Sequence, residues 1–249
     1  MCGITGILNF EKDRNIDRKT ISKMTLALTH RGPDGYGIYL NNNIGFGHRR
    51  LSIIDLETGS QPMSLKDDSF TITYNGEIYN YLELREELKS QGFVFYTNSD
   101  TEVILYAYKK WGVECLNKFN GMWALAIWDN FKKELFLSRD RIGEKPLFYY
   151  NDKNSFIFAS EIKSVLLSGI HKEYDPKVLE IYLTLGYIPA PYAFFKNIKK
   201  LNPGEYILIK DKKIINQKYW DLPEIDENNL YKDKKYIYEK FTELLNDSV

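Results

Sequence analysis

Four strand-like runs follow one another between residues 122 and 159, and they constrain the fold more than any other feature. The runs are Met122–Trp128, Glu134–Ser138, Leu147–Tyr150 and Phe156–Ala159. Asp129-Asn130 is a turn signal between the first two. Aromatic residues make up 15% of the chain, with 19 Tyr and 14 Phe, and flat side chains of this kind pack well across neighbouring strands. The sequence therefore predicts broad, half-buried sheets.

Helical patterns separate further strand-like runs in the first 170 residues. Cys2–Phe10 and Phe70–Tyr74 are strand-like, whereas Arg18–Thr29 carries apolar residues at helical spacing. Capping-box signatures at Asn80 and at Ser99 open two more helices. We therefore expect two layers of strands with helices.

The composition changes after about residue 170. Asp175-Pro176 places an N-cap before a proline at the first helical position, and this helix is predicted to end near Gly186. Tyr206–Ile209 and Ile214–Tyr219 are predicted to pair as a hairpin. A last helical pattern has apolar residues at Tyr238, Phe241 and Leu245. We expect a connector and the opening of another unit.

Charge and cysteine content exclude several classes of protein. The chain has 34 basic and 34 acidic residues, whereas proteins that bind nucleic acid or anionic membranes need surplus Lys and Arg. Cys2 and Cys115, with only 3 His, form neither a disulfide framework nor a metal-ligand spacing. The sequence shows no signal peptide and no run near the ~18 apolar residues of a membrane-spanning helix. We therefore expect no nucleic-acid, membrane or metal partner and a cytoplasmic, reducing location.

Cys2 is the most reactive candidate residue. Removal of Met1 would leave a thiol and a free α-amine on one residue, and an α-amine has a pKa of about 7.7–8.0. Such a base can activate the adjacent thiol as a nucleophile. By position alone, however, Cys2 also suits a small buried side chain in an edge strand.

Asn75-Gly76 follows a strand and has two interpretations. An Asn-Gly pair is a strong hairpin signal, but the next segment opens a helix. The Asn side-chain N–H and the Gly backbone N–H can instead converge on a developing oxyanion. The residues alone leave both interpretations open.

Charged residues at two places in the chain can bind the ends of an amino acid. Arg49 and Arg50 enter an apolar strand, and they either mark a solvated strand end or supply a guanidinium that forks onto a carboxylate. Asp100 either complements a helix dipole or pairs with an ammonium group. Together with Cys2 and Asn75-Gly76, these residues describe acyl transfer from an amino-acid-like amide, for which glutamine is the natural candidate.

Other polar motifs are interpreted as structural. The segment Arg31–Gly35 is read as a tight loop, and His30 and His48 as structural residues. Arg139-Asp140-Arg141 is predicted to form an ion-pair network, and Cys115 to be a buried core thiol.

Several motifs together resemble the class II glutamine amidotransferase domain of glutamine-hydrolysing asparagine synthetase of the B type. They are Met1-Cys2-Gly3-Ile4, His30-Arg31-Gly32-Pro33-Asp34, Gly47–Asp55, Tyr74–Asn80, Ser99–Glu102 and Ser138–Leu147. The resemblance continues to Pro223. It implies an α+β fold, the αββα sandwich of N-terminal-nucleophile hydrolases.

The resemblance also implies a division of the chain. Residues 1–170 would form the glutaminase core, 171–223 an extension of that domain and a connector, and 224–249 the first helix of a truncated α/β synthetase domain. The family's Ser-Gly-Gly-x-Asp-Ser loop for ATP is absent from this sequence, so we expect either a fragment or a naturally short relative. We expect ATP and Mg²⁺ only for the missing synthetase domain, and no cofactor for glutamine hydrolysis.

The site residues follow from the same resemblance. Cys2 would attack glutamine and form a thioester, with its own α-amine as base, and Asn75 and Gly76 would form the oxyanion hole. Arg50 would bind the glutamine carboxylate. The glutamine ammonium would bind to Asp100 and the backbone of Glu77. The backbone of four further residues would line the pocket: Leu51, Ser52, Ile53 and Ile54.

The reaction implied by the resemblance is hydrolysis of L-glutamine to glutamate and ammonia. In a full-length enzyme the ammonia would pass to the synthetase domain, which makes asparagine from aspartate and converts ATP to AMP and diphosphate. Two alternatives stay open. The ammonia acceptor can be another molecule, such as a sugar of a cell-surface polysaccharide, or the chain can be a non-catalytic glutamine-binding module. The sequence also leaves open a homodimer.

Overall fold

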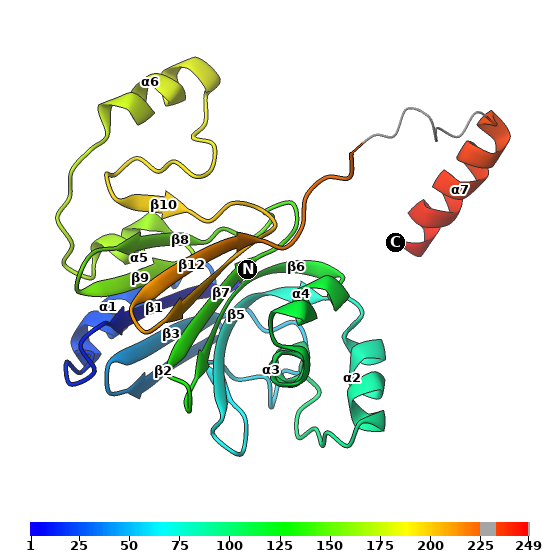
Figure 1. The fold of residues 1–249 in the computed structure, drawn as a ribbon, viewed down its shortest axis with the longest axis horizontal. Helices are drawn as coiled ribbons and strands as arrows, with labels where there is room; N and C mark the ends of the chain where they lie inside the picture. The colour runs from blue at the N-terminus through cyan, green and yellow to red at the C-terminus, as the bar shows by residue number, and fades with distance from the viewer. Residues whose placement is uncertain (225–232, 249) are drawn as a thin grey trace.

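The computed structural model of the chain describes residues 1–224 and 233–248. Two six-stranded sheets stack face to face, and helices cover their outer faces (Figure 1). The strands are joined in antiparallel ladders within each sheet. This is the αββα sandwich that the resemblance implies.

The spatial order of the strands shows which segments meet. The first sheet contains, in order, β10 (Ile198–Lys200), β8 (Phe148–Asn151), β9 (Ser155–Ala159), β1 (Gly3–Asn9), β3 (Ile44–Arg50) and β2 (Gly35–Asn41). The second sheet contains β12 (Lys213–Lys218), β11 (Glu205–Lys210), β7 (Glu134–Arg139), β6 (Gly121–Asp129), β5 (Phe70–Ile78) and β4 (Met63–Ser64). The four strand-like runs between residues 122 and 159 are therefore confirmed, and they divide between the two sheets.

Helices cover each sheet from outside. On the first sheet lie α1 (Arg18–Leu26) and α5 (Ile162–Leu166). Beside the second sheet lie α2 (Tyr81–Ser90), α3 (Asp100–Trp111), the short 3-10 helix η1 (Gly112–Glu114) and α4 (Cys115–Lys118).

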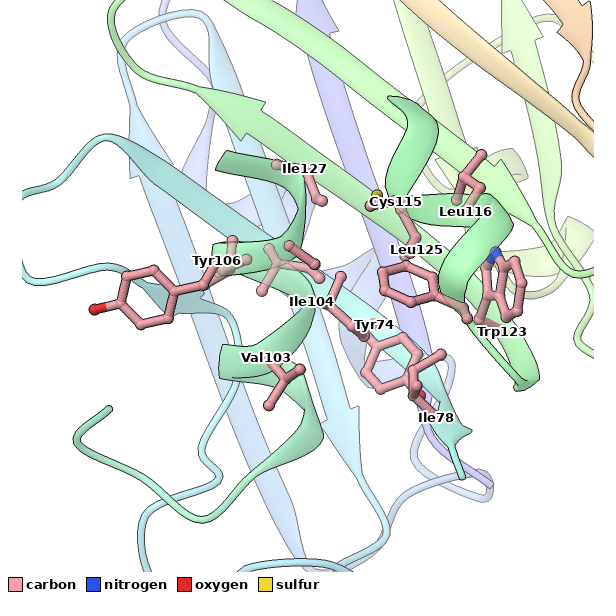
Figure 2. Close-up of a cluster of buried hydrophobic side chains, with 14 of the residues drawn as sticks. Tyr74, Ile78, Val103, Ile104, Tyr106, Cys115, Leu116, Trp123, Leu125 and Ile127 are labelled. Carbon is pink, nitrogen blue, oxygen red and sulfur yellow. The ribbon is translucent and has the colours of Figure 1, made fainter. Parts of the chain in front are cut away.

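The alternation of side chains along β5 decides which residues face the gap between the sheets. Tyr74 and Ile78 of β5 pack with Leu125 of β6 in the cluster under α3 (Figure 2). Because successive side chains of a strand point to opposite faces, Thr73 and Asn75 point the other way, toward the first sheet. A catalytic candidate is thus brought to the interior face by a local period of two.

Two of the residues interpreted as structural are confirmed as such. His48 of β3 is fully buried, and its Nδ1 lies 3.1 Å from the Thr73 hydroxyl of β5, so the pair joins the two sheets. Burial lowers the pKa of His48 to about 3 and keeps the ring neutral. Cys115 is a core thiol at 1% exposure (Figure 2).

The two predicted capping boxes are only partly present. Asn80 is the N-cap of α2, but its side chain makes no cap hydrogen bond. It bonds backbone groups at the end of α4 and before β6 instead. Ser99 does accept the N–H of Thr101 at 3.1 Å, whereas Glu102 accepts backbone N–H groups from the segment before α3. The Asn80 and Glu102 side chains therefore bind backbone groups other than those that the capping-box rule predicts.

The predicted ion-pair network around Arg139 is wrong. The Arg139 guanidinium donates to backbone carbonyls, and the Asp140 carboxylate accepts backbone N–H groups. Both charged side chains therefore hold backbone groups in place, most of them in the segment after β7.

The C-terminal part completes both sheets. α6 (Pro176–Leu185) begins after the N-cap Asp175, as predicted, and ends at Gly186 in the left-handed conformation. The predicted hairpin is β11 with β12, and β10 and β11 pair with strands of the core. α7 (Lys234–Asp247) stands apart in Figure 1 and buries no side chain. Residues 225–232 and 249 of the predicted unit 224–249 lie outside the described residues, and a truncated synthetase domain stays a prediction.

Candidate active site

The candidate residues come from four separate segments that the sandwich brings to one end. Cys2 precedes β1, and Arg50 ends β3, whose pairing with β1 starts at Gly3 and Arg49. Asn75 lies in β5 of the other sheet, and Asp100 opens α3. All four candidates line one pocket of about 130 Å³. The pocket is small beside the roughly 300–1,000 Å³ of drug-sized sites.

Cys2 lies at the wall of this pocket and is partly exposed. Its Sγ accepts the Leu51 N–H at 3.3 Å and lies 3.6 Å from the Leu51 carbonyl oxygen. Burial raises the pKa of the thiol, although the Leu51 hydrogen bond and the charge of Arg50 act against it. The thiol is therefore protonated at neutral pH and needs a base to become a nucleophile.

Asn75 offers a donor that nothing in the described residues uses. It is 1% exposed, and its side-chain Nδ2 is buried without a hydrogen-bond partner in that part of the chain. A buried donor left unpaired costs about 1–3 kcal/mol. Its retention at the pocket is therefore explained best by a ligand oxygen that accepts from it.

Gly76 offers a second donor beside the first. Trp123, its partner in β6, directs both its backbone N–H and its carbonyl to Asp140, at 3.2 and 2.8 Å. In an antiparallel ladder Gly76 then belongs to a non-hydrogen-bonded pair, so its N–H points away from β6. A Cβ on Gly76 would lie 2.1 Å from the Met122 carbonyl oxygen. The hairpin interpretation of Asn75-Gly76 is wrong, because both residues lie inside β5.

Arg50 holds the loop that follows it. Its guanidinium donates to the carbonyl oxygens of Ile54 (3.0 Å), Asp55 and Leu56 (3.3 Å). A guanidinium carries five N–H donors in a fixed fork, so Arg50 can shape this loop and still face the pocket.

Asp100 is a buried carboxylate at the start of α3. It is 4% exposed, and its Oδ2 accepts from the Tyr74 hydroxyl at 3.0 Å and the Ile78 N–H at 3.2 Å. Burial raises the pKa of Asp100, although both hydrogen bonds oppose this. Within the part of the chain that the structure describes, no Lys or Arg pairs with it. A bound ammonium would supply the missing charge.

The remaining sequence candidates divide around the pocket. Leu51, Ile53, Ile54 and Glu77 line it. Ser52 does not, and its N–H donates to the Asp34 carboxylate at 2.9 Å. Met1 also lies at the pocket and is 55% exposed, with its Sδ 3.5 Å from Lys145 Nζ.

The sequence did not predict several residues that line the pocket. They are Gly59, Gln61, Tyr74, Ser99, Thr101, Met122 and Lys145. Gln61 fixes the pocket loop to β5, since its side chain accepts the Tyr74 N–H at 2.7 Å and donates to the Tyr74 carbonyl at 3.1 Å. Lys145 is 6% exposed, and its place in a recognised motif was the only signal that could have found it.

The described residues contain neither a metal-binding cluster nor a membrane-spanning helix. Within 1–224 and 233–248, no three His, Cys, Asp or Glu side chains gather in a way that could hold a metal ion. In the same residues no helix has both the length and the apolar character needed to cross a membrane.

Two stacked antiparallel sheets with a cysteine at the start of an inner strand define the N-terminal-nucleophile hydrolase class of fold. The family model described as "Glutamine amidotransferase domain" matches residues 1–220. The chain therefore belongs to the family of glutamine amidotransferase domains.

The chain is also similar to curated proteins whose names are more specific than the family description. The chain is 44% identical to the putative asparagine synthetase [glutamine-hydrolyzing] 2 of Methanocaldococcus jannaschii, over 100% of the chain and 52% of that protein. It is 39% identical to the asparagine synthetase [glutamine-hydrolyzing] 3 of Bacillus subtilis, over 89% of the chain and 37% of that protein. The chain thus spans about half the length of these relatives or less.

Among solved structures, the glutamine phosphoribosylpyrophosphate amidotransferase of B. subtilis is similar. It matches 88% of this chain and 49% of its own, with a TM-score of 0.64 and 21% sequence identity. At this identity the likeness concerns the fold alone, and it agrees with the predicted sandwich.

Proposed function

We propose that this protein hydrolyses L-glutamine to glutamate and ammonia, as the glutaminase part of an enzyme of the asparagine synthetase type. The observation that carries the proposal is one pocket lined by the Cys2 thiol, the Asn75 amide, the Arg50 guanidinium and the buried Asp100 carboxylate, with Asn75 Nδ2 lacking a hydrogen-bond partner among the described residues. These groups match the amide, the carboxylate and the ammonium of glutamine in charge and in hydrogen bonding.

The first chemical step uses the N-terminal residue as nucleophile and base. Once Met1 is removed, the α-amine of Cys2 takes the Sγ proton, and Sγ attacks the side-chain carbonyl carbon of glutamine. The oxyanion that forms accepts hydrogen bonds from Asn75 Nδ2 and the Gly76 N–H. The C–N bond then breaks, the nitrogen takes the proton, and ammonia leaves a glutamyl thioester.

The second step returns the enzyme to its starting state. The α-amine takes a proton from water as the water oxygen attacks the thioester carbonyl carbon. The same two donors stabilise the second oxyanion, the C–S bond breaks, and the proton returns to the thiol as glutamate forms. No cofactor enters either step.

Charge complementarity orients the substrate. Arg50 would bind the α-carboxylate, and Asp100, with the backbone of Glu77, would bind the α-ammonium. Both substrate charges are present before and during the reaction, so these contacts set affinity. Leu51, Ile53 and Ile54 would shape the pocket between the two ends.

The ammonia acceptor and the setting are part of the proposal. Relatives named as glutamine-hydrolysing asparagine synthetases favour aspartate over a polysaccharide sugar, and a pocket with nucleophile and oxyanion donors favours an enzyme over a non-catalytic module. Ammonia would pass to a synthetase domain that uses ATP and Mg²⁺. A reducing, cytoplasmic location suits a mechanism that needs the Cys2 thiol free. A homodimer stays a prediction.

The test is glutamate release from glutamine by the wild-type chain and by Cys2→Ala. We expect Cys2→Ala to lose activity by at least about 10³-fold, because no covalent route remains. Intact mass on the same samples shows whether Met1 has been removed. Cys115→Ala is the matched control, since it removes the other thiol from the core and should keep activity. Turnover in Cys2→Ala equal to that of the wild type would refute the mechanism.

A further inference from the structure

A loop behind the nucleophile, formed by residues 30–34, has no role in the proposed reaction. Arg31 Nε donates to the Cys2 carbonyl oxygen at 2.9 Å. Gly32 O accepts from Arg49 Nε at 2.9 Å, and the Asp34 carboxylate accepts the Ser52 N–H. The 30–34 loop therefore contacts the nucleophile and the segment that carries Arg50 and Leu51.

Arg31 is held in turn by one carboxylate. Its Nη1 lies 3.1 Å from Glu161 Oε1, and the Arg31 side chain is only 10% exposed. His30 Nε2 lies 2.7 Å from the same oxygen, and Lys163 Nζ lies 3.2 Å from Oε2. Burial would raise the pKa of Glu161, but these three hydrogen bonds together hold it below its usual value. The carboxylate is therefore charged at neutral pH.

The Glu161 side chain is not used by its own helix. It is the residue before α5, at the N-cap position, yet its side chain makes no cap hydrogen bond. The preceding residue, Ser160, is hydrogen-bonded to the first residues of β1, through Ile4 N to Ser160 Oγ at 3.0 Å and Ser160 N to Ile4 O at 2.9 Å. The 160–161 segment thus holds the start of β1 directly and Cys2 through Arg31.

Cys2 needs such support because the strand ladder does not include it. The pairing of β1 with β3 begins at Gly3, and after removal of Met1 the backbone of Cys2 would be joined to the chain on its carbonyl side alone. A carbonyl fixed by Arg31 restricts rotation of the residue and so the direction of both its amine and its thiol.

We propose that Glu161 is a positioning residue for Cys2, acting through Arg31 on the Cys2 carbonyl group. This inference rests on the proposed function. A displacement of about 1 Å at a reacting group can lower a rate by up to 10²-fold. Loss of the contact between Glu161 and Arg31 should therefore lower kcat and leave glutamine affinity unchanged.

The experiment compares Glu161→Ala and Glu161→Gln with wild type in glutaminase kinetics. Glu161→Ala should lower kcat by about 10–100-fold and leave KM within about twofold. Glu161→Gln keeps an acceptor oxygen for Arg31 and should recover most of the lost rate. Alkylation of Cys2 by iodoacetamide should slow in the same order, which reports on the thiol without glutamine. Glu173→Ala, which removes an exposed ion pair with Lys196, is the control and should match wild type.

The outcomes distinguish failure of the proposed glutaminase function from failure of the positioning role of Glu161. A wild-type chain without glutaminase activity removes the proposed function. An active wild type with unchanged kcat in Glu161→Ala overturns the positioning role alone. The role is also overturned if Glu161→Gln loses as much rate as Glu161→Ala, or if the loss in both follows a lowered Tm. If Glu161→Ala does not fold, the comparison of kcat, KM and alkylation in Glu161→Gln and Arg31→Lys decides in the same way, with Arg31→Lys expected to show the larger loss in kcat at unchanged KM.

Discussion

The two sheets contribute different kinds of residue to the pocket. The first sheet contributes Cys2 and Arg50, which lie at strand ends and are partly exposed. The second sheet and its helix contribute Asn75 and Asp100, which are 1% and 4% exposed. Partly exposed groups thus come from the first sheet, and desolvated groups come from the second sheet and its helix.

This difference has a physical meaning. An unpaired donor or an uncompensated carboxylate is expensive in the interior, and among the described residues Asn75 of the second sheet and Asp100 of α3 supply one of each at the pocket. The first sheet instead satisfies its groups through backbone contacts, such as Leu51 with Cys2 and the 54–56 carbonyls with Arg50. We infer that the second sheet is preorganised for charge that arrives with the substrate or develops during the reaction.

The largest effect that would test this comparison is expected for Asn75→Ala. Removing a donor that acts on the developing oxyanion should lower kcat by about 10²–10³-fold, with a small change in KM. Steady-state glutaminase kinetics measure both. A change confined to KM would mean that Asn75 binds the ground state and that the second sheet holds no transition-state donor.

A smaller effect is expected for Arg50→Ala on the first sheet. The glutamine carboxylate is present in the ground and transition states alike, so KM should rise by about 10–100-fold while kcat changes little. Arg50→Lys keeps the positive charge but not the forked guanidinium, and its KM should lie between those of the wild type and Arg50→Ala. A kcat loss with unchanged KM would show that Arg50 mainly shapes the loop through Ile54 and Asp55.

The smallest effect, on stability, is expected for Asp100→Asn. The folded pKa of Asp100 is raised by burial above the ordinary value of 3.8, so its ionisation disfavours folding once the pH exceeds the unfolded value. Asp100→Asn should raise the free energy of unfolding at pH 7 by about 0.5–2 kcal/mol, as single stabilising substitutions do. It should also weaken glutamine binding.

Denaturant unfolding at several pH values checks whether Asp100→Asn raises or lowers the free energy of unfolding. The advantage of Asp100→Asn should be full above the folded pKa and should disappear as the pH falls below the ordinary value of 3.8. If the substitution lowers stability at pH 7, Asp100 acts chiefly as a favourable charge at the start of α3.

The sequence by itself predicted the main strands and helices and named the candidate site residues that the structure brings to one pocket. The strands from residue 122 to 159 and the helix after Asp175 follow from periods of two and 3.6 and from cap residues, which are local properties. The motifs around Cys2, Arg50, Asn75 and Asp100 carried the family resemblance, because each is a short run of specific residues.

Only the tertiary structure decided how those residues are used. That Asn75-Gly76 lies within a strand, that Asn80 does not cap its helix, and that Arg139 binds carbonyls all depend on partners far along the chain. The contact between Arg31 and Glu161 spans 130 residues, and neither residue carries a local sign of it. Hydrogen bonds and burial arise between segments brought together by sheet pairing, so a pattern read along one segment cannot contain them.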